Sequence, residues 1–106
     1  MITKEVFEEA LFGKDDVCVV NFSYDSESGN LFDFAVVYLS KKESGALEII
    51  RFDSSQKEAF HIHKFFASGK KEKQYIQMEL DFNTVEWCIA ELREKWFKYK
   101  IAFFDG

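Results

Sequence analysis

The sequence predicts a small α+β domain in which helices cover one face of an antiparallel sheet. Runs rich in Val, Ile and Phe alternate with polar turns between Asp16 and Leu80, and consecutive strands with short connections favour a meander. The segment after Asn83 repeats apolar residues every three or four positions, as in an amphipathic helix. The length of 106 residues leaves room for a single domain, residues 1–106.

The N-terminal segment has the pattern of a short helix. Thr3 is a suitable N-cap, acidic residues follow it, and Gly13 is a suitable end. The apolar residues that would share one side of this helix are Val6, Phe7, Ala10 and Leu11. We therefore expect a short N-terminal helix that packs on the sheet.

The middle of the chain predicts about five strands in meander order. Clusters of turn-forming residues at Asp25 to Asn30 and at Lys41 to Gly45 separate the first three. The expected strands run from Asp16 to Tyr24, Phe32 to Ser40, Leu47 to Asp53, Glu58 to Phe66, and Lys73 to Leu80.

The C-terminal segment predicts a long amphipathic helix of roughly twenty residues. Asn83 and Glu86 have the spacing of a capping box at its start. The apolar stripe comprises Val85, Cys88, Ile89, Leu92, Trp96, Tyr99 and Phe103, and it needs a sheet face to cover it. Trp87, Phe97 and Phe104 lie off this stripe, so we expect them to contact the N-terminal helix or a second copy of the chain.

Composition restricts the class of protein. The net charge of −5 argues against a protein that coats DNA non-specifically. The acidic start and the lack of any run of ~18 apolar residues predict a soluble, cytoplasmic protein with no membrane partner. Cys18 and Cys88 are too few for a metal motif and are expected to be buried thiols. The 13 phenylalanines exceed the needs of a small core, which indicates a partner surface or a homodimer.

The two histidines form the candidate site. His61 and His63 are two residues apart in an expected strand, so both side chains point to the same face, opposite Ile62. Arg51 and Asp53 precede them in the neighbouring strand. These groups could transfer protons, hold a phosphate, bind a metal, or form an ordinary solvated sheet face.

The register of the hairpin decides which side chains face the histidines. In one register Arg51 lies opposite His61, which gives a cationic site. A slip of one residue brings Glu48 opposite His63 instead, which gives an imidazole–carboxylate site. We prefer the first register because it points Phe52 toward the helix.

The chemistry that best suits the cationic site is cleavage of RNA phosphodiester bonds without a metal or any other cofactor. One imidazole would accept the 2′-hydroxyl proton, and the other would donate a proton to the leaving oxygen. Asp53 would orient an imidazole, and Arg51, Lys64 and Lys71 would bind the substrate phosphate. The catalytic residues predicted in this way are His61, His63, Asp53 and Arg51.

Two other interpretations of the sequence stay open. A metal site would need a third ligand beside the two imidazoles, and only Asp53 or Glu48 could supply it. A non-enzymatic interaction module would bind a protein partner, or a second copy, through its aromatic helix and exposed sheet edge.

The histidine region also resembles a known family. The residues that carry the resemblance are, in order, Phe52 and Asp53, His61, His63 and Phe65, then Thr84, Val85 and Glu86. The segment from about Ile49 to Arg93 resembles the TumE-type small toxins of prokaryotic toxin–antitoxin modules. The resemblance implies a growth-inhibiting toxin that acts on RNA and is neutralised by an antitoxin protein encoded beside it. The family positions carried over are Asp53, His61 and His63.

Overall fold

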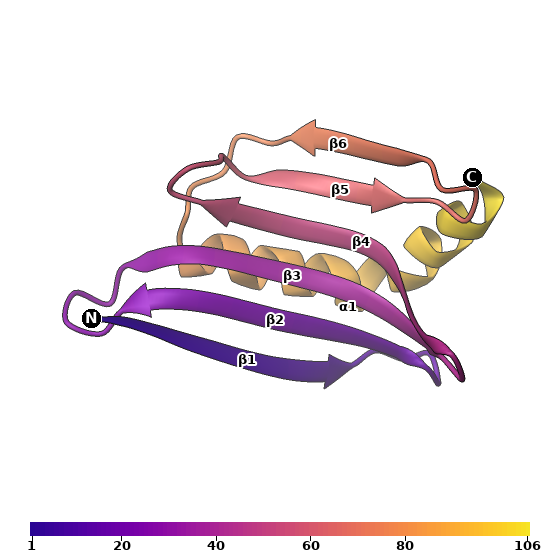
Figure 1. Cartoon of the computed structure of the whole chain (residues 1–106), viewed down its shortest axis with the longest axis horizontal. Helices are drawn as coiled ribbons and strands as arrows, with labels where there is room; N and C mark the ends of the chain where they lie inside the picture. The colour runs from indigo at the N-terminus through magenta and orange to yellow at the C-terminus, as the bar shows by residue number, and fades with distance from the viewer.

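Six strands form one antiparallel sheet in sequential order, and a single helix follows them (Figure 1). The computed structural model describes residues 1–106. Its elements are β1 (Ile2–Ala10), β2 (Asp16–Asp25), β3 (Leu31–Lys42), β4 (Gly45–Ser55), β5 (His61–Phe65), β6 (Lys71–Tyr75) and α1 (Phe82–Asp105). The predicted single α+β domain, with its meander sheet and long C-terminal helix, is confirmed.

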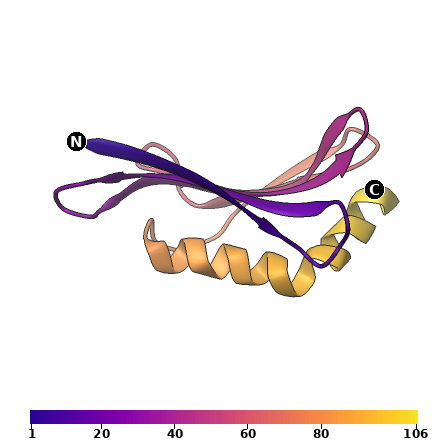
Figure 2. The ribbon, with the colours of Figure 1, turned by 90° about the horizontal axis from the view of Figure 1, so that it is seen from below.

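The molecule has two layers, because α1 lies across one face of the sheet and no element covers the other (Figure 2). We call these the helix face and the open face. The helix packs against the central strands β3 and β4. One buried row crosses four strands of the helix face in register, formed by Val20, Val36, Phe52 and Ile62. Residues next to this row in sequence point to the open face.

The predicted N-terminal helix is wrong, because Ile2–Ala10 forms the edge strand β1 instead. It pairs with β2 along its full length, from Ile2 opposite Asp25 to Ala10 opposite Val17. The hydrogen bonds of this ladder outweigh a weak local preference for helix. Most β1 side chains are exposed, and glutamates on such an edge discourage pairing with other chains.

Several boundaries also differ from the sequence prediction, including the start of β5 at His61 rather than at Glu58. The last strand, expected from Lys73 to Leu80, is β6, Lys71–Tyr75. The N-cap of α1 is Asp81 rather than Asn83, and its Oδ1 accepts a hydrogen bond from the backbone N of Thr84 at 2.9 Å.

The aromatic residues of α1 divide differently from the prediction. Trp87 lies edge-on to the rings of Phe52 and Phe60, with centroids 6.1 and 6.3 Å away, although 37% of its surface is exposed. Phe97 and Phe104 are exposed. Trp87 therefore packs on the sheet rather than on an N-terminal helix.

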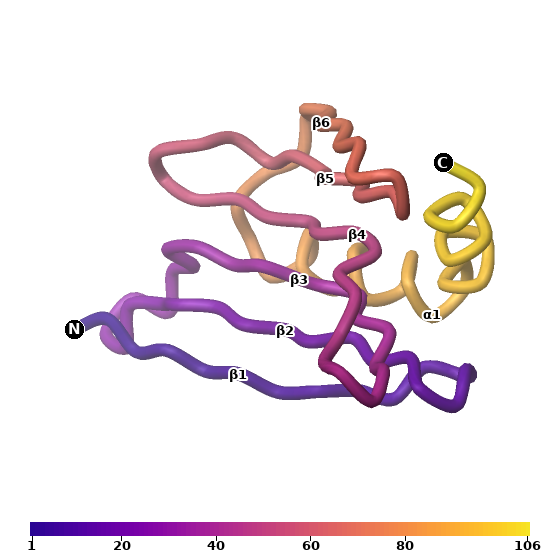
Figure 3. The backbone as a smooth tube through the Cα atoms, turned by 45° about the vertical axis from the view of Figure 1, so that its right-hand side comes forward, coloured from indigo at the N-terminus to yellow at the C-terminus, as the bar shows by residue number.

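The C-terminal turns of α1 are anchored at two places. They lie beside the β5–β6 connection (Figure 3), where the backbone N of Ala67 donates to the carbonyl of Phe103 at 2.9 Å. Earlier in the helix, Lys100 Nζ lies 3.2 Å from Oδ2 of the buried Asp16. Asp16 Oδ1 accepts from the buried Tyr38 hydroxyl at 2.6 Å, so a polar network ties α1 to the sheet.

Candidate functional site

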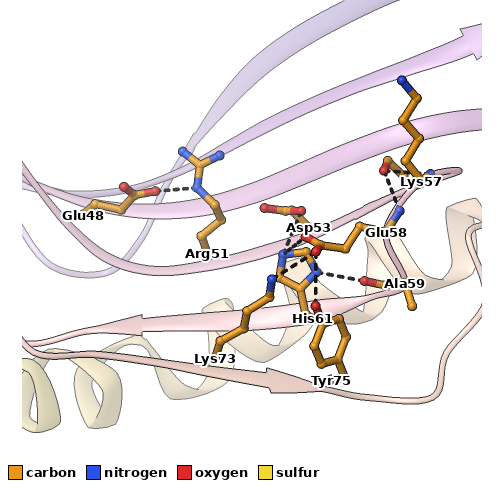
Figure 4. A network of polar contacts seen from close by, with 10 residues as sticks. Glu48, Arg51, Asp53, Lys57, Glu58, Ala59, His61, Lys73 and Tyr75 are labelled. Atoms are coloured by element: carbon orange, nitrogen blue, oxygen red, sulfur yellow. Dashed lines mark hydrogen bonds and ion pairs between the residues drawn. The ribbon is translucent and has the colours of Figure 1, made fainter.

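Three neighbouring strands bring the candidate site together on the open face (Figure 4). In the β4–β5 ladder Asp53 pairs with His61 and Arg51 pairs with His63. This register differs by two residues from the expected one, so the same side chains share the face but have different partners. In the β5–β6 ladder His61 pairs with Tyr75 and His63 with Lys73.

His61 is the buried centre of the site, with 1% of its surface exposed. Its Nδ1 lies 2.8 Å from the carbonyl oxygen of Ala59. A carbonyl only accepts, so Nδ1 donates and carries the hydrogen. On the other side of the ring, Nε2 lies 3.1 Å from Asp53 Oδ1 and 3.3 Å from Glu58 Oε1. Nε2 therefore faces two carboxylates, which suits either a proton or a cation at this nitrogen.

Glu58 is a member of the site that the sequence reasoning missed. Its Oε2 accepts hydrogen bonds from Lys73 Nζ at 3.0 Å and from the Tyr75 hydroxyl at 3.1 Å (Figure 4). The hydrogen bond from Lys73 is the main cause that lowers the pKa of Glu58 below its ordinary value. The Ser55 hydroxyl accepts from the Glu58 backbone N at 3.1 Å and so shapes the loop after β4.

His63 is the more accessible imidazole. It is partly exposed, with its ring edge-on to His61 at a centroid distance of 4.7 Å and stacked with Phe65 at 6.1 Å. Loss of hydration lowers the pKa of His63 below its ordinary value, and the positive charges of protonated His61 and of Lys73 add to this effect. The nearby carboxylates of Asp53 and Glu58 oppose the shift.

A β-bulge brings Arg51 and Glu48 to the same face. Tyr38 pairs with Ile50, and the next ladder position pairs Leu39 with Glu48, so Ile49 has no partner. Beyond this extra residue the alternation reverses, and Arg51 Nε donates to Glu48 Oε1 at 2.7 Å (Figure 4). Arg51 and Glu48, which the sequence analysis treated as alternatives, therefore form an ion pair at the end of the site.

The structure brings only one of the two expected phosphate-binding lysines to the histidine face. Lys64 pairs with the buried Ile50 and lies on the helix face, because it adjoins His63 in the strand. Lys71 is on the open face, where its Nζ lies 5.9 Å from the centre of the Phe65 ring. Lys73 is the lysine beside the histidines, and the sequence reasoning missed it.

A groove of about 460 Å³ extends from the site across the open face. Arg51 and Asp53 line it and also belong to the site. The other lining residues come from β1 to β4 and are Lys4, Glu5, Val6, Asn21, Phe22, Ser23, Asp33, Phe34, Ala35, Ser54 and Ser55. The open-face groove therefore meets the site at Arg51 and Asp53, and neither histidine lines it.

Asp53, His61 and His63 also have the arrangement of a metal-ligand set. Each offers one ligand atom, and these three atoms lie within 4.8 Å of one another. The two thiols are remote from this set, because Cys18 and Cys88 are buried in the core beneath the helix face. Burial raises the pKa of Cys18 to about 12, so this thiol stays neutral.

Comparison with known proteins shows to which family the chain belongs. No curated protein and no solved structure matches the chain. The one helix, α1, is not apolar enough to cross a membrane. The family model of the domain of unknown function DUF7718 matches residues 1–106, and the chain therefore belongs to that family.

Proposed function

We propose that this chain is a toxin-like protein of a toxin–antitoxin module and that it cleaves RNA at the histidine site. The observation that carries the proposal is the cluster of Asp53, His61 and His63, whose Asp53 also lines the open-face groove. These are also the three positions of the TumE-type resemblance. They come from two neighbouring strands, Asp53 from β4 and both histidines from β5. A groove that reaches Asp53, beside two imidazoles, suits a proton-transfer reaction on an extended substrate.

The proposed reaction is an intramolecular transesterification. The 2′-oxygen forms a bond to phosphorus while the bond from phosphorus to the 5′-oxygen breaks, which leaves a 2′,3′-cyclic phosphate. His63, the partly exposed imidazole, accepts the 2′-hydroxyl proton. His61 donates a proton to the departing 5′-oxygen, and both of its nitrogens face acceptors that favour bound hydrogens. Because His61 is buried, Glu58 must move from Nε2 as the phosphate enters.

Cationic groups beside the histidines would balance the charge that develops on the phosphate oxygens. Arg51 pairs directly with His63 across the ladder, and the Lys73 backbone flanks His63 on the other side. Both side chains are held by glutamates, Arg51 by Glu48 and Lys73 by Glu58. A bound phosphate would replace these carboxylates as the partner.

Purified protein incubated with RNA tests the proposal. His63→Ala should reduce cleavage by about 10²–10⁴-fold, because one proton-transfer group is lost. Gln74→Ala is the matched control, since Gln74 neighbours Lys73 but points to the helix face. Induced expression of the wild type, but not of His63→Ala, should stop growth. Equal cleavage by the wild type and His63→Ala would refute the proposal.

A second candidate function, self-association, rests on a separate observation. Phe97, Ile101 and Phe104 follow a spacing of four and three residues along α1, and their exposed fractions are 59%, 46% and 51%. Such a stripe is typical of a helix that packs on another helix. Sedimentation should then show a dimer in the wild type and a monomer in Ile101→Glu. Lys98→Glu is the control, because Lys98 is exposed but lies about 100° around the helix from Phe97. A wild-type monomer at high concentration would exclude this function.

A further inference from the structure

We infer that Asp53, His61 and His63 bind one divalent transition-metal ion of the Zn²⁺ class. Binding itself does not depend on the proposed function, whereas its effect on RNA cleavage does. The inference rests on ligand spacing, on the hydrogen on His61 Nδ1, and on the burial and charge of the cluster.

The spacing around His61 Nε2 is that of ligands on a shared ion. Two donor atoms bound to one ion at about 2.1 Å are separated by about 3.0–3.4 Å in octahedral or tetrahedral geometry. Asp53 Oδ1 and Glu58 Oε1 lie 3.1 and 3.3 Å from Nε2. The ligand atom of His63 lies within 4.8 Å of those of Asp53 and His61. A rotation of this partly exposed ring would complete the set.

The outer contacts are those expected around metal ligands. A metal-bound histidine usually donates its other ring N–H to a carbonyl or carboxylate, and His61 Nδ1 lies 2.8 Å from the Ala59 carbonyl oxygen. In a neutral ring this leaves the Nε2 lone pair directed at the carboxylates. Glu58, the fourth candidate ligand, is oriented through its other oxygen by Lys73 and Tyr75.

Burial and charge favour a cation with one open coordination position. His61 is inaccessible, while Asp53 and His63 are partly exposed toward the open face. Asp53 and Glu58 place two carboxylates against a single ammonium group, that of Lys73. Mixed imidazole and carboxylate ligands suit Zn²⁺, Co²⁺ or Mn²⁺ better than Mg²⁺, which prefers oxygen ligands and bound water.

A bound metal ion would change the proposed reaction. A cation bound through His63 occupies the lone pair that would accept the 2′-hydroxyl proton. Zn²⁺ should therefore inhibit metal-free cleavage, and a chelator should restore it. Zn²⁺ that instead proves necessary for cleavage would support the metal site and contradict the metal-free acid–base step.

The test is calorimetric titration of Zn²⁺ into chelator-treated wild-type protein. One ion should bind per chain, and His63→Ala and Asp53→Asn should each weaken binding by about tenfold or more. Asp33→Asn is the matched control, because Asp33 is another partly buried carboxylate that lines the groove but lies outside the cluster. Mg²⁺ should bind at least about a hundred times more weakly than Zn²⁺.

Nuclear magnetic resonance of the imidazole nitrogens provides a second readout. Zn²⁺ should shift the Nε2 signal of His61 while the ring keeps its hydrogen on Nδ1. Absence of stoichiometric binding, or equal affinity in the wild type and His63→Ala, would overturn the inference, as would an equal loss in Asp33→Asn. RNA cleavage without Zn²⁺ binding refutes only the metal site, and Zn²⁺ binding without RNA cleavage under any condition refutes only the proposed function.

Discussion

Tyr38→Phe should destabilise the fold more than its single lost oxygen suggests. The Tyr38 hydroxyl donates to Asp16 Oδ1 at 2.6 Å, and the two residues are 0% and 2% exposed. Without the hydroxyl, Asp16 keeps only Lys100 as a side-chain partner, through its other oxygen. A buried hydrogen bond to a charged group contributes about 1.5–3 kcal/mol. We therefore expect a loss of about 2–3 kcal/mol in the free energy of unfolding and a fall of about 10 °C or more in Tm.

Urea unfolding followed by tryptophan fluorescence measures this loss, provided that the denaturant slope stays unchanged. Tyr99→Phe is the matched control, because it removes the same atom from a partly buried hydrogen bond of 2.8 Å to Glu91. The control should lose about 0.5–1.5 kcal/mol. Equal losses in the two variants would show that burial of Asp16 adds nothing, and would refute the argument.

Three further changes test the packing. Trp87→Ala should cost about 2 kcal/mol in urea unfolding because its ring packs on Phe52. Phe97→Ala should cost less, and the opposite order would mean that α1 is rotated. At Gly13 an added Cβ would lie 1.8 Å from Asp16 Oδ2; Gly13→Ala should therefore lower Tm, and an unchanged Tm would refute the close approach. Burial raises the pKa of Cys18 from 9.0 to about 12, so the folded state keeps the thiol neutral at pH values where the unfolded chain ionises. The stabilisation from the neutral thiol is therefore complete below about pH 8.5 and declines above it. Between pH 9 and 10, Cys18→Ala should reduce this decline in the free energy of unfolding by about 1 kcal/mol, and an unchanged slope would contradict the burial argument.

Much of the sheet follows from local pattern. Turn clusters and apolar runs predicted β2 to β5 in meander order, and the alternation of residues placed both histidines opposite Ile62. The prediction for the N-terminal segment was wrong because its apolar spacing fits a helix, whereas pairing with β2 favours an edge strand. The sequence of the segment alone does not show that β2 is available as a partner. The same limit applies to α1, whose cap at Asp81 lies before the apolar pattern begins.

The candidate site was only partly predictable because its members depend on register. The side chains of Asp53, His61 and His63 lie on one face whenever the β4–β5 register shifts by an even number of residues. The alternation of residues along the strands was therefore enough to predict that they lie together. Glu58 and Lys73 reach the site through a loop conformation and a second ladder, which local sequence does not encode.

Arg51 and Glu48 show how one local irregularity changes the chemistry of the site. In a regular strand, residues three apart point to opposite faces, and the sequence offered one or the other as a neighbour of the histidines. The unpaired Ile49 turns both toward the open face, while Ile49 and Ile50 are both buried in the core. The guanidinium is consequently paired with the Glu48 carboxylate. If the chain cleaves RNA as proposed, the phosphodiester must compete with Glu48 for Arg51. This competition would favour the transition state, in which the phosphate oxygens carry more negative charge than one carboxylate.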